Sequence, residues 1–340
     1  MRANTVTRLM DRLTLERCQV WIYLAAIAGG LMLGSLQPSL GPRFDALLWP
    51  VLMVLLYTTF VQVPLLHMRD AFRDRRFVLA ILAGNFVLIP LVVWLALKWL
   101  PDDPALHLGV LLVLLVPCTD WFITFTQLGR GNTLLATAVT PLNLVVQLLL
   151  LPIYLWLIFP AADFGAVLRT EEMLSTTFAL IGIPLVAAAL TERWVDARPR
   201  RVVWRERLGW WPVPLLAVVV LLVAGAQVGL VRDAGPILLK VLPVFVGYLL
   251  VAALLARLLT RALRLPMDIG RTLAFSLGTR NSFVVLPFAL ALPAGWEFTV
   301  IVIVFQSLVE LFGMVFYLWW LPCRLFNETS DDATVERNSS

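Results

Sequence analysis

Long apolar runs alternate with short polar segments along the whole chain. Ten apolar windows stand out, with approximate limits 18–36, 46–67, 77–99, 108–128, 133–159, 173–191, 210–231, 237–259, 271–293 and 298–321. A helix of roughly 20 residues crosses the hydrocarbon core of a bilayer and satisfies its own backbone hydrogen bonds there. The pattern therefore predicts an all-α membrane protein with ten transmembrane helices.

Composition narrows the class of protein further. Of the 340 residues, 60% are hydrophobic and 14% are charged, whereas a soluble domain is about half apolar and about a quarter charged. The chain has three cysteines, Cys18, Cys118 and Cys323, and this number is too small for a disulfide framework. These values exclude an ordinary soluble enzyme, a disulfide scaffold and a disordered chain.

The 27 lysines and arginines are distributed unevenly over the segments between the windows. With the N-terminus in the cytoplasm, the inner segments hold 21 of them and the outer segments hold 5, and Arg280 falls inside a window. Because cytoplasmic loops carry the excess of positive charge, we expect a multi-pass protein of the inner (plasma) membrane with both termini in the cytoplasm. The basic net charge then reflects topology, and no nucleic-acid partner is expected.

Two halves of the chain show similar patterns. An offset of 163 residues places Cys118 on Asn281, Asn143 on Gln306 and Gln147 on Glu310. The offset predicts two inverted five-helix repeats, 18–159 and 160–321, which is an architecture typical of secondary transporters. The identity between the halves is weak, so a chance correspondence is the alternative. Outside the repeats we expect a cytoplasmic N-terminal segment, 1–17, and a disordered cytoplasmic tail, 322–340.

The fourth and ninth windows contain residues that interrupt helices. Pro117 removes a backbone donor in the fourth window, and Gly278 lets the chain leave helical geometry in the ninth. We expect helices 4 and 9 to be broken and to cross near the middle of the bilayer. Polar side chains gather at these positions and in the neighbouring windows: Cys118, Thr119, Asp120, Arg280, Asn281, Ser282, Asn143, Gln147, Gln306 and Glu310.

This polar cluster has two interpretations. It is either a substrate site lined by unwound backbone and half-helix ends or a set of hydrogen bonds that holds the helices together. Arg280 needs a counter-charge at this depth, and Asp120 and Glu310 are the candidates. The resulting carboxylate–arginine network serves either as a proton relay or as a fixed structural ion pair.

Cys118 is either a small apolar filler or a thiol that contacts a soft trivalent metalloid. The chain contains no nucleotide-binding loop, no H-E-x-x-H and no G-x-S-x-G motif. We therefore expect a protein that is not an enzyme, that uses no cofactor and no structural metal, and that transports a solute downhill or on an ion gradient.

The motifs of these windows resemble those of the arsenical-resistance permeases, the arsenite efflux branch of the bile acid:sodium symporter superfamily. The similar segments are Pro117-Cys118-Thr119, Arg130-Gly131, Leu142-Asn143, Gly278 with Asn281, and Leu308-Val309-Glu310. The chain departs from the arsenite branch at Val284, where that branch carries a glutamate. It departs from the sodium-coupled branch at Ser276 and Arg280, and a fixed arginine at such a place argues against sodium coupling.

The resemblance and the residues together predict a secondary transporter that exports arsenite or antimonite, coupled to protons. Cys118 would contact the metalloid, beside Thr119, Asn143, Asn281 and Ser282. The proton and charge network would comprise Asp120, Arg280, Glu310, Gln147 and Gln306. The alternative is an organic-anion transporter in which Arg280 clamps a bile-acid-type carboxylate. The expected partners are the small solute and membrane lipid, and the sequence does not predict an oligomeric state.

Overall fold

The computed structural model describes residues 2–64, 74–119, 121–158 and 171–327. Within these ranges the chain is helical, and its α-helices are α1 (Arg2–Leu36), α2 (Gly41–Phe60), α3 (Arg75–Ala83), α4 (Ile89–Leu97), α5 (Pro104–Leu115), α6 (Trp121–Leu128), α7 (Thr133–Ile158), α9 (Glu171–Asp196), α10 (Val202–Leu208), α11 (Pro212–Ala226), α12 (Val228–Ala262), α13 (Met267–Gly278), α14 (Ser282–Leu290) and α15 (Glu297–Trp320).

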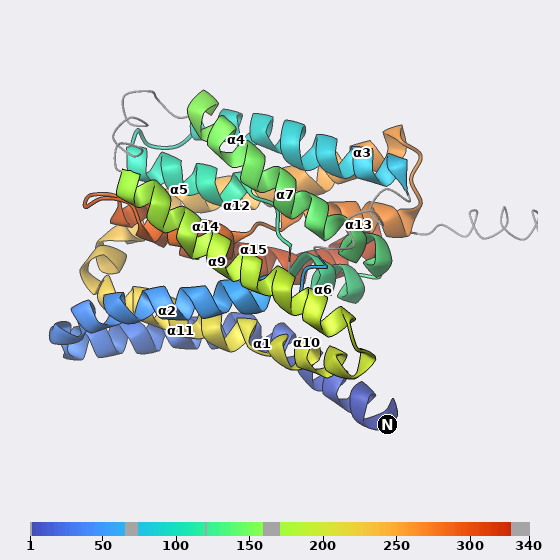
Figure 1. The fold of residues 1–340 in the computed structure, drawn as a ribbon. Helices are drawn as coiled ribbons and strands as arrows, with labels where there is room; N and C mark the ends of the chain where they lie inside the picture. The colour runs from blue at the N-terminus through green and yellow to red at the C-terminus, as the bar shows by residue number, and fades with distance from the viewer. Residues whose placement is uncertain (1, 65–73, 120, 159–170, 328–340) are drawn as a thin grey trace, which may run out of the picture.

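The helices form two layers. One layer contains α1, α2 and α11, which pack on one another, with α9 packed on α2. The other contains α3 to α7 and α12 to α15, where α12 packs on α13 and α15, and α15 packs on α5 (Figure 1). The layers touch where α15 packs on α1 and where α14 packs on α2 and α9. Each layer therefore combines helices from the first and the second half of the chain.

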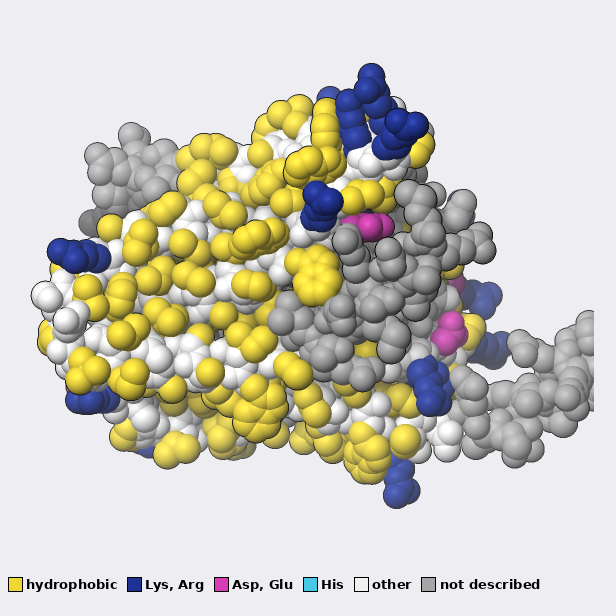
Figure 2. Space-filling model, turned by 90° about the horizontal axis from the view of Figure 1, so that it is seen from below, with side chains coloured by type: hydrophobic (Ala, Val, Ile, Leu, Met, Phe, Trp, Pro, Cys, Tyr) yellow, Lys and Arg dark blue, Asp and Glu magenta, His cyan; other side chains and the backbone are white. Residues whose placement is uncertain are grey.

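Several of these helices match the length of a bilayer. Among the described residues, seven helical stretches are long and apolar enough to cross a membrane, namely Cys18–Leu36, Pro38–Phe60, Arg75–Leu97, Thr133–Ile158, Pro199–Ala226, Val228–Ala262 and Glu297–Leu325. Hydrophobic side chains cover most of the face seen in Figure 2, and most of its Lys and Arg side chains lie toward the two ends. The protein is a multi-pass, helical membrane protein.

Helical structure continues beyond the predicted spans at both ends of the chain. At the N-terminal end, α1 begins at Arg2 and continues without a break through the first predicted span to Leu36. At the other end, the backbone continues as a π-helical turn, Leu321–Leu325. Phe326 is buried, and its carbonyl oxygen accepts hydrogen bonds from the Arg271 guanidinium (Nη2, 3.0 Å). The start of the predicted disordered tail is thus held in place by α13, and residues 328–340 lie outside the described residues.

The contact between α1 and α11 depends on glycines. A Cβ atom on Gly30 would lie 2.2 Å from the carbonyl oxygen of Leu221, and one on Gly34 would lie 2.2 Å from the carbonyl oxygen of Gly225. These atoms belong to backbone, which cannot move aside as a flexible side chain can. Small residues at such positions let two helices approach closely in a membrane.

We expect Gly30→Ala to destabilise the protein by about 1–3 kcal/mol, the usual cost of overpacking. The matched control is Gly29→Ala, because a Cβ there would meet only the Leu221 side chain, at an ordinary 3.9 Å. The measurement is the apparent melting temperature of the detergent-solubilised protein. Equal melting temperatures for the two variants would show that α1 and α11 do not approach as closely as described.

Candidate functional site

Two interrupted helices cross in the layer formed by α3 to α7 and α12 to α15. The first break separates α5 from α6, and the second separates α13 from α14. Val116 and Thr279, which end α5 and α13, both have extended backbone angles. The breaks predicted beside Pro117 and Gly278 are therefore present in the fold.

The two breaks form backbone hydrogen bonds with each other. The Cys118 N–H donates to the Thr279 carbonyl oxygen (3.1 Å), and the Asn281 N–H donates to the Val116 carbonyl oxygen (2.8 Å). Between these hydrogen bonds, Pro117 and Arg280 face each other as a short antiparallel bridge. Backbone groups freed at helix ends need partners inside a membrane, and each break supplies them to the other.

Arg280 lies in the second break and is buried, with 2% of its surface exposed. Its guanidinium donates to four neutral oxygens, the amide Oδ1 of Asn85 (2.8 Å) and the carbonyl oxygens of Leu277 (2.6 Å), Ser276 (3.2 Å) and Leu114 (3.3 Å). These acceptors come from three separate segments of the chain. The guanidinium therefore ties α5, α13 and the π-helical turn Gly84–Leu88 together.

Glu310 on α15 contacts the same break in a different way from that predicted. Its Oε2 accepts a hydrogen bond from the backbone N–H of Arg280 (2.9 Å) and another from Nε2 of Gln306 (2.8 Å). Within the described residues, the hydrogen bonds of the Arg280 guanidinium go to neutral oxygens instead. The Glu310 carboxylate thus caps the broken backbone, because the extended chain at residue 280 presents its N–H toward α15.

A second set of hydrogen bonds surrounds the start of α14. The Asn281 side chain donates to the Thr119 hydroxyl (3.0 Å), so the two breaks are also joined through side chains. The Ser282 hydroxyl donates to Oε1 of Gln306 (3.4 Å) and accepts from the Ser307 hydroxyl (2.8 Å). Cys118 is buried in the first break beside these groups. The predicted residues Thr119, Asn281, Ser282 and Gln306 are thus brought together.

Residues 49–233 match the Sodium Bile acid symporter family, over more than half of the chain. The chain belongs to the sodium bile acid symporter family. No curated protein matches the chain.

Membership of the sodium bile acid symporter family indicates a secondary transporter, and it agrees with the multi-pass helical fold. The matched region contains the first break, at Pro117, and the whole of α7. Arg280 and Glu310 lie beyond it, so the roles of these residues are argued from geometry alone.

Helix α7 carries two buried amide side chains. Asn143 and Gln147 are four residues apart, so they lie on the same face of the helix. All four of their amide atoms are buried, and none has a hydrogen-bond partner within the described part of the chain. An unpaired buried amide costs free energy, so these two side chains are open to a ligand. Oε1 of Glu310 is buried and unpaired in the same way.

Tyr248 is a residue of the site that the sequence did not indicate, and one predicted residue lies outside the described residues. The Tyr248 hydroxyl donates to the Leu277 carbonyl oxygen (2.6 Å), and its ring centroid lies 5.6 Å from the Arg280 guanidinium carbon. Asn85 donates to the Ser276 hydroxyl (3.0 Å) while it accepts from Arg280. Asp120, the other predicted counter-charge, is not among the described residues.

Proposed function

We propose that this protein is a secondary transporter that exports arsenite or antimonite, as the neutral hydroxides of these metalloids, in exchange for protons. The observation that carries this proposal is that the Arg280 guanidinium is already hydrogen-bonded to oxygens of the protein itself. Four oxygens of the chain occupy its guanidinium, which leaves a thiol, hydroxyls, amides and the Glu310 carboxylate as the other polar groups that the described residues bring to the crossing. Such a set suits a small neutral hydroxide better than an anion.

The proposed architecture is ten spans in two inverted repeats, 18–159 and 160–321. Seven stretches have the length and apolarity of a span, and the remaining three spans would be α9 and the two interrupted pairs. The layers support the repeat, because α1 and α2 share a layer with α9 and α11, and the breaks between α5 and α6 and between α13 and α14 share the other. The uneven loop charge supports cytoplasmic termini in the inner membrane.

The metalloid is proposed to contact Cys118, because a thiol is the soft ligand that arsenic(III) and antimony(III) prefer. The hydroxyls of Thr119 and Ser282 and the amides of Asn143 and Asn281 would bind its oxygens. A single thiol gives a weak and reversible contact, and a transporter needs such a contact because it must release its cargo.

The alternative, transport of an organic anion clamped by Arg280, has less support. The guanidinium is buried and holds four oxygens of the protein itself, so a carboxylate would have to break these contacts in order to bind. Only its Nε lacks a partner in the described chain, and a bidentate clamp needs two adjacent donors.

We expect Cys118→Ser to lower arsenite resistance in a sensitive host at least roughly tenfold, a loss typical of a weakened metal-ligand shell. Membrane abundance should stay at the wild-type level, because serine is nearly the same size. Cys18→Ser and Cys323→Ser are the matched controls, since both cysteines are exposed, and both variants should keep full resistance. Full resistance in Cys118→Ser would show that the thiol is only a filler.

A further inference from the structure

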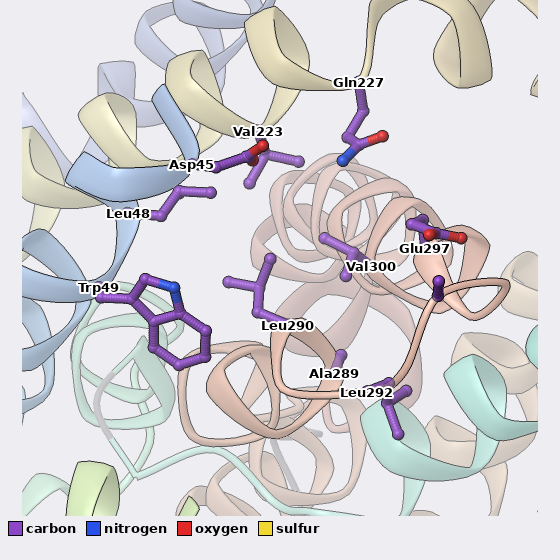
Figure 3. Close-up of a pocket in the computed structure, with 11 residues that line it drawn as sticks. Asp45, Leu48, Trp49, Val223, Gln227, Ala289, Leu290, Leu292, Glu297 and Val300 are labelled. Atoms are coloured by element: carbon purple, nitrogen blue, oxygen red, sulfur yellow. The ribbon is translucent and has the colours of Figure 1, made fainter. Parts of the chain in front are cut away.

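A cavity of about 300 Å³ opens between the two layers, at the end of the molecule away from α10. It is lined by residues from α2, α11, α14 and α15, together with the segments that join them (Figure 3). Its polar side chains are two carboxylates, Asp45 and Glu297, the amide of Gln227 and the indole of Trp49. No lysine or arginine is among the described residues that line it. We call this space the acidic cavity.

A much smaller pocket, of about 20 Å³, lies deeper along the same helices. It has room for about one water molecule. Its polar lining comes from Ser282 and Ser307, which are hydrogen-bonded to each other (2.8 Å), and from Tyr23 on α1. Because Ser282 follows Asn281 directly, this inner pocket adjoins the crossing of the interrupted helices.

The acidic cavity and the inner pocket are separated by about one helical turn along each of three helices, α11, α14 and α15. Along α11 the lining changes from Val220 to Val223, along α14 from Leu286 to Ala289, and along α15 from Ile303 to Val300. Three residues of helix span about 4.5 Å. All six side chains are apolar and buried. We call Val220, Leu286 and Ile303 the apolar plug.

The plug joins the two layers. Val220 belongs to the layer of α1, α2 and α11, whereas Leu286 and Ile303 belong to the layer that contains the crossing. All three side chains line the inner pocket and belong to the same hydrophobic core, and none of them can form a polar link, so a relative movement of the layers would separate Val220 from the other two. The route from the acidic cavity to Ser282 would then be continuous.

We propose that the acidic cavity is the outer end of the transport route, and that it excludes anions and admits neutral or cationic solutes. Two carboxylates in a cavity with low-dielectric walls concentrate a negative potential there. The inference rests on the proposed function and narrows its substrate class, because a neutral metalloid hydroxide passes such an entrance and a carboxylate is repelled. The apolar plug closes the route between transport events.

The test compares two thiol reagents of opposite charge, neither of which crosses membranes. The reporter is Leu290→Cys, which lines the acidic cavity, in a variant that lacks the exposed Cys18 and Cys323 and keeps the buried Cys118. The measured quantity is the ratio of two rate constants, that for a cationic methanethiosulfonate over that for an anionic one. The ratio is divided by the same ratio for a small free thiol, and the result should be at least about 10. Adding Asp45→Asn and Glu297→Gln should bring this ratio close to unity. A ratio that these two changes leave unaltered would overturn the charge selection.

The plug is tested with a second reporter. Val304→Cys lines the inner pocket and should react at least about tenfold more slowly than Leu290→Cys, and Leu286→Ala should remove most of this difference by emptying part of the plug. Equal rates at the two positions in the otherwise unchanged protein would overturn the plug. In intact cells, a reagent that is added outside the cell should label Leu290→Cys. Labelling that requires permeabilised cells would overturn the placement at the outer face, and it would do so independently of whether arsenite is the substrate.

Discussion

Replacing Arg280 with methionine should prevent the protein from accumulating in the membrane, rather than leave a folded transporter without an anion site. The substitution removes the donor from four buried oxygens, those of Asn85, Ser276, Leu277 and Leu114. Each buried acceptor that is left without a donor costs about 1–3 kcal/mol, and the substitution affects several of them at once. Together these costs are a large part of the stability of most proteins.

The experiment measures membrane abundance and the apparent melting temperature in detergent for Arg280→Met, Arg280→Lys and Arg232→Met. Arg280→Lys should recover part of the stability, because an ammonium keeps the charge but lacks the planar fork of donors. Arg232→Met is the control, since this arginine is exposed and donates to the hydroxyl of Ser35, which is exposed too (3.2 Å). Wild-type stability in Arg280→Met, together with loss of carboxylate transport, would favour the organic-anion alternative.

The positions of the breaks were predictable because proline and glycine act on the backbone locally. Pro117 cannot donate a backbone hydrogen bond wherever it lies. Gly278 lets the chain leave helical geometry wherever it lies. The fold adds a separate, tertiary reason for this glycine, since a Cβ there would lie 2.8 Å from the Tyr317 ring on α15. The contact between Gln306 and Glu310 could also be predicted from the sequence, because residues four apart on a helix are neighbours.

The partners of Arg280 could not be predicted from residue types. The sequence shows which side chains are charged, but it does not show which carbonyl oxygens an interrupted helix leaves unpaired. Two of the guanidinium's acceptors are the carbonyl oxygens of Ser276 and Leu277, at the end of α13. Tyr248 was missed for a related reason, because an aromatic residue in an apolar span is usually core or lipid-facing.

The acidic cavity was also invisible in the sequence. Asp45 and Glu297 lie 252 positions apart, near the ends of predicted spans, where carboxylates are ordinary interfacial residues. Only the packing of α2 and α11 against α14 and α15 brings the two carboxylates to one space. The chemistry of the entrance is therefore a property of how the layers meet.

Replacing Glu310 with glutamine should abolish proton-driven transport while leaving the fold intact. Glutamine has nearly the same shape, and its amide oxygen can still accept the hydrogen bond from the Arg280 N–H. What it loses is the ability to gain and release a proton, and Glu310 is a buried carboxylate with one unpaired oxygen at the crossing. An ionisable side chain at this depth is costly unless it has a function.

The measurement uses everted membrane vesicles with an imposed proton gradient and follows the uptake of arsenite. In Glu310→Gln, gradient-driven uptake should fall to the level of vesicles without the protein, a loss of at least roughly 100-fold, while exchange of internal for external arsenite without a gradient should persist. Glu310→Asp, which keeps the carboxylate one methylene shorter, should retain measurable gradient-driven uptake. Loss of both uptake and exchange in Glu310→Gln would assign the carboxylate to substrate binding or to structure. Undiminished gradient-driven uptake would remove it from the coupling mechanism, because a side chain that cannot take up a proton cannot carry one across.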